Sequence, residues 1–211
     1  MKPEDVKIVN EAIKELERNI GIHDGFFESL LKPDSDWSFV VKLHSFFEAV
    51  CSMLIIEALS KKELIEVISR LDMSDRYCGK IAFINRLSLL HEGARGFIRK
   101  LSELRNFYVH DIKNISLSLE DYIQKLDKNR LNNFITSIGY DTYEKIQIRE
   151  IIIDKGQFIK ENPKFAIYLG AFSVLAEITV QMKLQNLKFR EEEFRKKAAN
   201  FFITISEKLS S

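Results

Sequence analysis

The arrangement of apolar residues along the chain predicts an all-α protein. In residues 3–20, apolar side chains recur at spacings of three and four, which is the pattern of an amphipathic helix. Residues 36–60 are apolar on nearly every side, and a helix of that kind belongs at the centre of a fold. Only 8 Gly and 3 Pro interrupt the 211 residues. So few breakers favour helices over strands, because strands need many turns.

The same periodicity predicts further helices at residues 61–71, 74–90, 94–110, 119–138, 163–187 and 189–209. The last of these is an additional amphipathic helix at the C-terminal end of a compact bundle. Residues 139–163 fit either a helix or a short strand, so the pattern leaves them open. We expect a single domain over residues 1–211, with its core at about residues 36–187.

Composition and charge narrow the function classes. Hydrophobic residues make up 45% of the chain and charged residues 30%, which is typical of a folded protein and excludes a disordered one. The 32 Lys and Arg nearly balance the 31 Asp and Glu, so bulk charge attracts neither nucleic acid nor anionic lipid. Any RNA binding must therefore come from a local patch.

The sequence predicts a cytoplasmic protein without a membrane partner. The first residues are charged and lack the apolar segment of a signal peptide, and the most apolar run, residues 165–182, contains Glu177 and falls short of a membrane span. Cys51 and Cys78 lie in apolar helical patterns with no metal-ligand spacing, so we expect reduced core residues. Phosphate-loop, Cys-x-x-Cys and His-Glu-x-x-His motifs are absent, and no metal or cofactor is predicted.

The candidate chemistry lies at the end of the helix predicted at 94–110. Arg105, Asn106 and His110 fall there within about one and a half turns. Helical spacing predicts a buried stripe formed by Phe97, Leu101, Leu104 and Tyr108. It predicts an opposite polar side formed by Arg99, Glu103, Asn106 and His110. Arg105 falls at the edge of the buried stripe and does not face His110, because five residues at about 100° each separate the two.

Each of the three residues suits a separate role in metal-independent RNA cleavage. The guanidinium of Arg105 stays protonated, so it would bind the scissile phosphate and stabilise the charge of the transition state. His110 titrates near neutral pH and would act as general acid or base. Asn106 lies one turn before His110 and would donate to a phosphate oxygen or orient the imidazole.

One histidine is only half of an acid and base pair, so a single copy of the motif is incomplete unless another group supplies the second proton transfer. A twofold dimer that pairs the helix ends would bring two Arg105 and two His110 into one cleft. Residues 86–113 contain six Lys or Arg against three acids, a local excess of +3 that would attract RNA in a salt-sensitive way. In the alternative interpretation, Arg105 pairs with Glu48 or another acid at the edge of the core, and His110 complements the helix dipole. His44, four residues before Glu48, is better explained as a packed histidine bonded to its neighbour.

Two stretches, residues 80–87 and 98–110, resemble the HEPN superfamily, and within it the mannitol-operon repressor-like branch. The family pattern is an Arg, often followed by a polar residue, with a His four to six positions later at the end of a helix. Arg105, Asn106 and His110 fit this pattern. The resemblance implies a compact helical bundle that forms a homodimer whose twofold interface gathers the motif. It covers residues 36–187 and is strongest over 80–111.

The resemblance implies two functions. The leading one is a metal-independent endoribonuclease of toxin-antitoxin or phage-defence type, with RNA as substrate and an antitoxin or other protein as partner. The alternative is a non-catalytic regulatory or protein-interaction module, since mannitol-repressor-like members have no established nuclease role. Toxin members whose antitoxin adds nucleotides to them carry a Tyr two residues after the His. Here that position is Ile112, so the resemblance does not imply that mode of inactivation.

Overall fold

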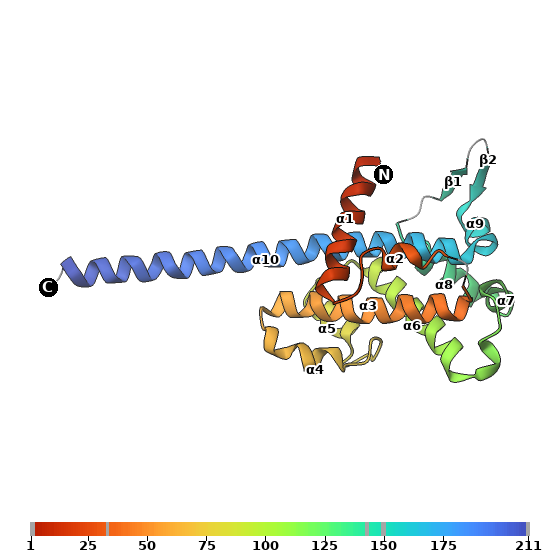
Figure 1. Ribbon diagram of the computed structural model, residues 1–211, viewed down its shortest axis with the longest axis horizontal. Helices are drawn as coiled ribbons and strands as arrows, with labels where there is room; N and C mark the ends of the chain where they lie inside the picture. The colour runs from red at the N-terminus through yellow and green to blue at the C-terminus, as the bar shows by residue number, and fades with distance from the viewer. Residues whose placement is uncertain (1–2, 33, 142–143, 149–150, 210–211) are drawn as a thin grey trace.

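The protein has an all-α fold with one short β-hairpin, as seen in a computed structural model that describes residues 3–32, 34–141, 144–148 and 151–209. Figure 1 shows the long helices α3 (Asp36–Leu59) and α10 (Pro163–Leu209) running beside each other, and α6 (Glu92–His110) crosses behind them. α3 contacts both α6 and α10, so it is the central helix. The prediction of an all-α protein built round residues 36–60 is confirmed.

Smaller elements surround these three helices. They are α1 (Pro3–Asn19), α2 (Phe26–Ser29), the 3₁₀ turn η1 (Lys62–Leu64), α4 (Ile65–Ser69), α5 (Lys80–Arg86), the 3₁₀ turn η2 (Ile112–Asn114), α7 (Leu119–Gln124), α8 (Lys128–Ile138), β1 (Lys145–Ile148), β2 (Ile151–Asp154) and α9 (Lys155–Glu161).

α3 is central because its sequence leaves no polar face to present to water. Ser35 caps its start by accepting a hydrogen bond from Ser38 N–H at 3.2 Å, and α3 then runs 24 residues without a breaker. Large side chains all round it are fully buried, among them Phe39, Phe47 and Leu54. These join one hydrophobic cluster that extends from α1 to the first half of α10. Burial on most sides, rather than a single apolar face, holds this helix in place.

Residues 139–163, which the sequence left open, contain both kinds of element. β1 and β2 pair antiparallel with Ile146 opposite Ile153, and α9 follows directly. Asp154 caps α9 by accepting from Gly156 N–H at 2.8 Å and from Gln157 N–H at 3.2 Å. Residues 142–143 and 149–150 of this stretch lie outside the described part of the chain.

Three predicted helix boundaries are wrong, and side-chain caps explain two of them. The helix expected at 74–90 is only α5, because Asp72 and Asp75 accept backbone N–H bonds and hold residues 72–79 in turns. The helix expected at 119–138 is divided by Asp127, which caps α8. The predicted break before 189 is absent, since no Gly or Pro follows Gly170 in α10.

The two cysteines differ. Cys51 is buried in α3 as predicted, and burial raises the pKa of its thiol to about 12. Cys78 is exposed, which corrects the expectation that it belongs to the core. It lies in the turn before α5, and its Sγ is 3.2 Å from Asp75 Oδ1.

Two helices, α3 and α10, are long and apolar enough to cross a membrane by length and composition alone. The expectation that the run at 165–182 falls short of a span is therefore wrong on these criteria. The apolar window of α3 is 67% buried inside the protein, and that of α10 is 44% buried. α3 thus uses its apolar surface for the core, whereas α10 leaves much of its surface exposed.

Candidate functional site

α6 carries all three candidate residues, and its two ends are fixed by side chains. At the start, Glu177 of α10 accepts a hydrogen bond from His91 N–H at 2.5 Å, and His91 caps the helix. At the end, Asn114 Nδ2 donates to the carbonyl of Phe107 at 2.8 Å. The Tyr108 hydroxyl donates to the carbonyl of Leu117 at 3.2 Å. The loop after His110 is thereby tied back to the last turn of α6.

The predicted faces of α6 are confirmed. Phe97, Leu101, Leu104 and Tyr108 are all fully buried. On the other side, Arg99, Glu103 and His110 are exposed and Asn106 is partly exposed. Arg105 is half-buried at the border between these two faces, where the sequence placed it.

The side chain of Arg105 is held by Asn106 and not by an acid. Its Nη1 donates to Asn106 Oδ1 at 3.1 Å. Among the described residues, no carboxylate forms an ion pair with Arg105, so the alternative in which it pairs with Glu48 is wrong. The guanidinium keeps its full charge and most of its donors.

A buried polar layer between α3 and α6 explains where Glu48 goes instead. His44 of α3 is buried, with Nε2 3.2 Å from Ser102 Oγ and Nδ1 3.6 Å from Glu48 Oε2. The Ser102 hydroxyl donates to the carbonyl of Ile98 at 3.1 Å, which leaves its oxygen free to accept from the Nε2–H of His44. The interpretation of His44 as a packed histidine beside Glu48 fits this geometry.

Arg105 acts on that layer through its charge. Burial and, to a smaller extent, the nearby positive charge of Arg105 together lower the pKa of His44 to about 4. His44 is therefore neutral at pH 7 and adds no second cation beside Arg105. This leaves the arginine as the charged member of the α3–α6 border.

His110 is the last residue of α6, and it is exposed. Within the described residues, no hydrogen bond or ion pair engages its ring, so the imidazole is open to a ligand. Asn106 lies one turn before it, between the faces that carry Arg105 and His110. A single copy therefore spreads the three groups round the end of the helix and does not point Arg105 and His110 at each other.

A groove lies between α6, α7 and α8. It has a cavity volume of about 490 Å³ and is lined by Lys100, Glu103, Phe107, Tyr122, Lys125, Leu126 and Arg130. The rings of Phe107 and Tyr122 pack edge to face with centroids 4.8 Å apart. Lys125 and Arg130 are exposed at its rim. No sequence motif marks these two cations, because packing of α7 and α8 on α6 brings them there.

The cations counted in residues 86–113 do not form the single patch that the sequence predicted. Arg86 donates to the carbonyl of Tyr77 at 2.9 Å, and Arg95 donates to the carbonyl of Leu90. Lys100 pairs with Glu103. The groove of α6, α7 and α8 adds Lys125 and Arg130, the second of which pairs with Asp127 at 3.4 Å.

In the described part of the chain, no three His, Cys, Asp or Glu side chains gather as metal ligands. The arrangement at the end of α6 instead offers an uncompensated guanidinium, a carboxamide and an exposed imidazole. No known family model, curated protein or solved structure matches this chain.

Proposed function

We propose that this protein is a metal-independent endoribonuclease of toxin or phage-defence type, built as a HEPN-like bundle that acts as a homodimer. One observation carries the proposal: the guanidinium of Arg105 is held by Asn106 without a neutralising acid, and an exposed His110 lies one turn further on. An arginine that only stabilised the fold would be expected to pair with a carboxylate such as Glu48.

The three groups have separate tasks in this mechanism. Arg105 grips the scissile phosphate and stabilises the extra negative charge of the transition state. Asn106 keeps the arginine side chain turned toward the side of α6 that carries His110. His110 removes the proton of the ribose 2′-hydroxyl or returns one to the leaving 5′-oxygen.

The second proton transfer comes from the second copy. A twofold axis at the helix ends brings two Arg105 and two His110 together, with one imidazole acting as base and the other as acid. The groove of α6, α7 and α8 would guide the RNA, with Lys125 and Arg130 near the phosphates. Its affinity for RNA should fall as salt is raised.

A non-catalytic regulatory or protein-interaction module, related to the mannitol-operon repressor, is the second candidate. It is favoured by the separation of Arg105 and His110 on different faces of α6. In that case the motif would serve the packing of α6 against α3, and partners would act elsewhere on the surface.

The decisive experiment incubates purified protein with a mixed RNA pool in the presence and absence of EDTA. Wild type should cleave equally in both. His110→Ala should lose about 10² to 10⁴ in rate, and Arg105→Ala about 10² to 10³. Arg99→Ala is the matched control, because Arg99 is an exposed arginine of the same helix outside the motif. Light scattering should give twice 24.6 kDa.

Mixed dimers separate a composite site from two independent ones. A dimer of Arg105→Ala with His110→Ala retains one intact arginine and one intact histidine, so a shared cleft should recover part of the activity. If wild type leaves RNA intact and His110→Ala changes only the melting temperature, the nuclease proposal is wrong and the regulatory one stands.

A further inference from the structure

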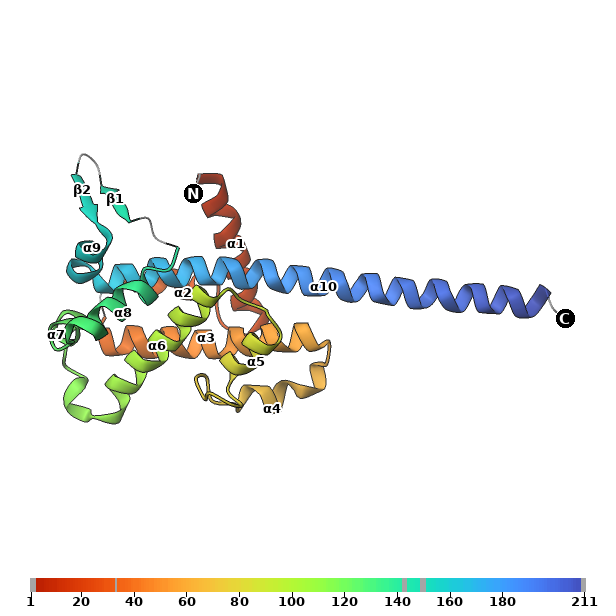
Figure 2. The same cartoon turned by 180° about the vertical axis from the view of Figure 1, so that it is seen from behind.

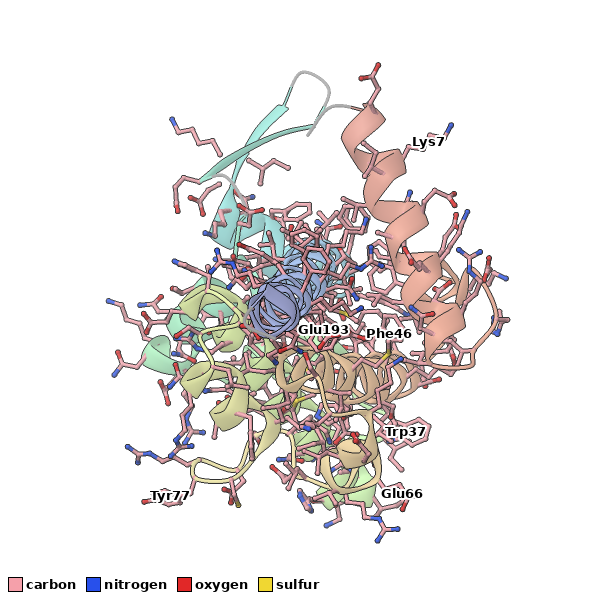
Figure 3. The ribbon with its side chains drawn as sticks, turned by 90° about the vertical axis from the view of Figure 1, so that its left-hand side faces the viewer. Lys7, Trp37, Phe46, Glu66, Tyr77 and Glu193 are labelled. Atoms are coloured by element: carbon pink, nitrogen blue, oxygen red, sulfur yellow. The ribbon has the colours of Figure 1, made fainter. Side chains whose placement is uncertain are left out.

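The second half of α10 projects from the bundle as a single helix. Figure 1 and Figure 2 show it extending beyond every other element, at the opposite end of the molecule from α7. Figure 3 looks along this helix and shows Glu193 on it, with the bundle behind. Nearly all of residues 183–201 are exposed. A helix segment with so little tertiary packing gains little stability from the rest of the fold.

Large apolar residues nevertheless follow one side of this exposed segment. Val180, Leu184, Leu187 and Phe194 are 56%, 43%, 61% and 73% exposed. Their spacings of four, three and seven match alternate a and d positions of a heptad repeat, with d at 180, 187 and 194. The remaining a position, between Leu187 and Phe194, is occupied by Glu191. We call these five positions the α10 stripe.

Basic residues flank the stripe on both sides. The g positions are Lys183, Arg190 and Lys197, and the e positions include Lys188 and Arg195. Glu191 pairs with Arg195 at 2.7 Å, which leaves the other flanking cations in excess. Glu192 and Glu193 fall at b and c positions, away from the stripe. A partner that packs against the stripe therefore meets positive charge along both edges.

This charge pattern argues against a second copy of α10 as the occupant. In a parallel pair of α10 helices the g and e positions of the two chains would oppose each other, and in an antiparallel pair g would oppose g and e would oppose e. Either arrangement places Lys or Arg against Lys or Arg. Like charges at these positions discriminate against self-pairing.

The width of the stripe argues against a membrane surface. Over residues 180–194 the apolar side chains lie at a and d positions, apart from Met182 and Phe189 at f positions on the opposite side of the helix. The a and d residues therefore form the narrow seam of a two-helix contact rather than the broad apolar face of a helix lying in lipid. Glu191 would also be carried into the acyl region, where a carboxylate is costly. In a two-helix contact, a polar a position instead fixes the register.

We propose that the α10 stripe docks an amphipathic helix of another protein, forming a two-stranded coiled coil. That helix carries apolar residues at its own a and d positions and Glu or Asp at e and g, which complement Lys183, Lys188, Arg190 and Lys197. It places a Lys or Arg opposite Glu191, and this pair sets the register. The inference rests on α10 alone and is independent of the proposed nuclease site.

The test uses full-length protein and two synthetic helical peptides of four heptads. Both have Leu and Ile at a and d with one Lys at a central a position; the first has Glu at all e and g positions, and the second has Lys there. Fluorescence anisotropy should show binding of the Glu peptide that weakens with salt, and at least tenfold weaker binding of the Lys peptide. Leu187→Glu combined with Phe194→Glu should abolish binding.

Charge-reversal variants provide the matched control. Arg190 lies on the flank of the stripe, so Arg190→Glu should weaken binding of the Glu peptide several-fold. Lys196→Glu makes the same change in charge at an f position, on the outer side of the helix, and should bind like wild type. Equal effects of the two variants would show that net charge, not the stripe, attracts the peptide, and would overturn the proposal.

Three further results would also overturn it. These are equal binding of both peptides, a wild-type dimer that Leu187→Glu with Phe194→Glu converts to monomer, and flotation with phosphatidylserine vesicles that the same double variant abolishes. RNA cleavage by the double variant should match wild type, because Leu187 and Phe194 lie on the half of α10 that projects away from the bundle containing α6 (Figure 1). Loss of peptide binding and loss of nuclease activity are therefore separate outcomes.

Discussion

Acidification should destabilise this fold through His44, well above the pH at which most proteins lose their carboxylate interactions. The imidazole is buried between α3 and α6, and burial, with help from the positive charges of Arg105 and Lys80, lowers its pKa from 6.5 to about 4. Asp72 acts weakly in the opposite direction. The unfolded chain then takes up a proton at a pH where the folded protein does not.

The sign and size follow from linkage. The pKa of His44 is lower in the folded than in the unfolded protein. The free energy of unfolding is therefore unaffected by the titration of His44 above about pH 6.5, and it falls as the pH drops from 6.5 toward 4, because the unfolded chain binds the proton first. Integrating between these two pKa values gives a loss of about 2 kcal/mol on going from pH 7.5 to pH 5. Below pH 4 both states are protonated, and His44 causes no further loss.

Urea unfolding at several pH values between 7.5 and 5 measures the effect, with His44→Gln as reference. The glutamine amide can still bond to Ser102 but does not titrate, so the difference between the two proteins isolates His44 from the carboxylates. An NMR titration of the His44 ring gives its pKa directly. Arg105→Met should raise that pKa, because it removes a positive charge that disfavours the imidazolium.

The reasoning fails if wild type and His44→Gln lose stability in parallel over this range. It also fails if Arg105→Met leaves the titration of His44 unchanged. The second result would mean that the guanidinium does not act on the polar layer between α3 and α6, and it would remove one argument for an uncompensated charge at the candidate site.

Two further predictions concern packing. Leu104→Ala should lower the free energy of unfolding in urea by about 2 to 5 kcal/mol because this side chain is fully buried. Val109→Ala, at a 40% exposed position of the same helix, should lower it far less. Equal losses would mean that the faces of α6 are misassigned. Gly170→Ala should destabilise by about 1 to 3 kcal/mol, since its Cβ would lie 2.6 Å from the carbonyl oxygen of Ile138. In Gly96→Ala the new Cβ meets nothing within 4 Å, so this variant should stabilise α6 by about 0.5 to 1 kcal/mol. If the melting temperature falls in both glycine variants, the space around the two Cβ positions does not explain the effects.

Hydrophobic periodicity was sufficient to predict the elements whose position depends on burial. α1, α3 and α6 lie where the spacing of apolar residues placed them, and the buried side of α6 is the predicted one. Boundaries set by single polar side chains were missed. Asp75 holds the turn before α5, and Asp127 caps α8, both through hydrogen bonds from backbone N–H groups that leave no trace in the apolar pattern.

The candidate site was predictable only in its residue types. Helical geometry placed Arg105 at the edge of the buried stripe, but its freedom from Glu48 depends on His44 and Ser102, which occupy the space between α3 and α6. Lys125 and Arg130 reach the groove through tertiary packing, which no local pattern encodes. Whether two copies complete the site is a property of an assembly and remains a proposal.

The all-round burial of α3 also has a consequence for synthesis of the chain. α3 ends at Leu59, but its partner α10 begins only at Pro163. At about 5 to 20 residues per second, translation of the intervening segment takes roughly 5 to 20 s. During that interval a helix apolar enough to cross a membrane lacks the cover that α10 supplies. We therefore expect ribosome-bound chains arrested before Pro163 to recruit chaperones that recognise apolar segments. Chains long enough to expose α10 outside the ribosome should release these chaperones. Equal recruitment by chains of both lengths would show that α3 is covered earlier.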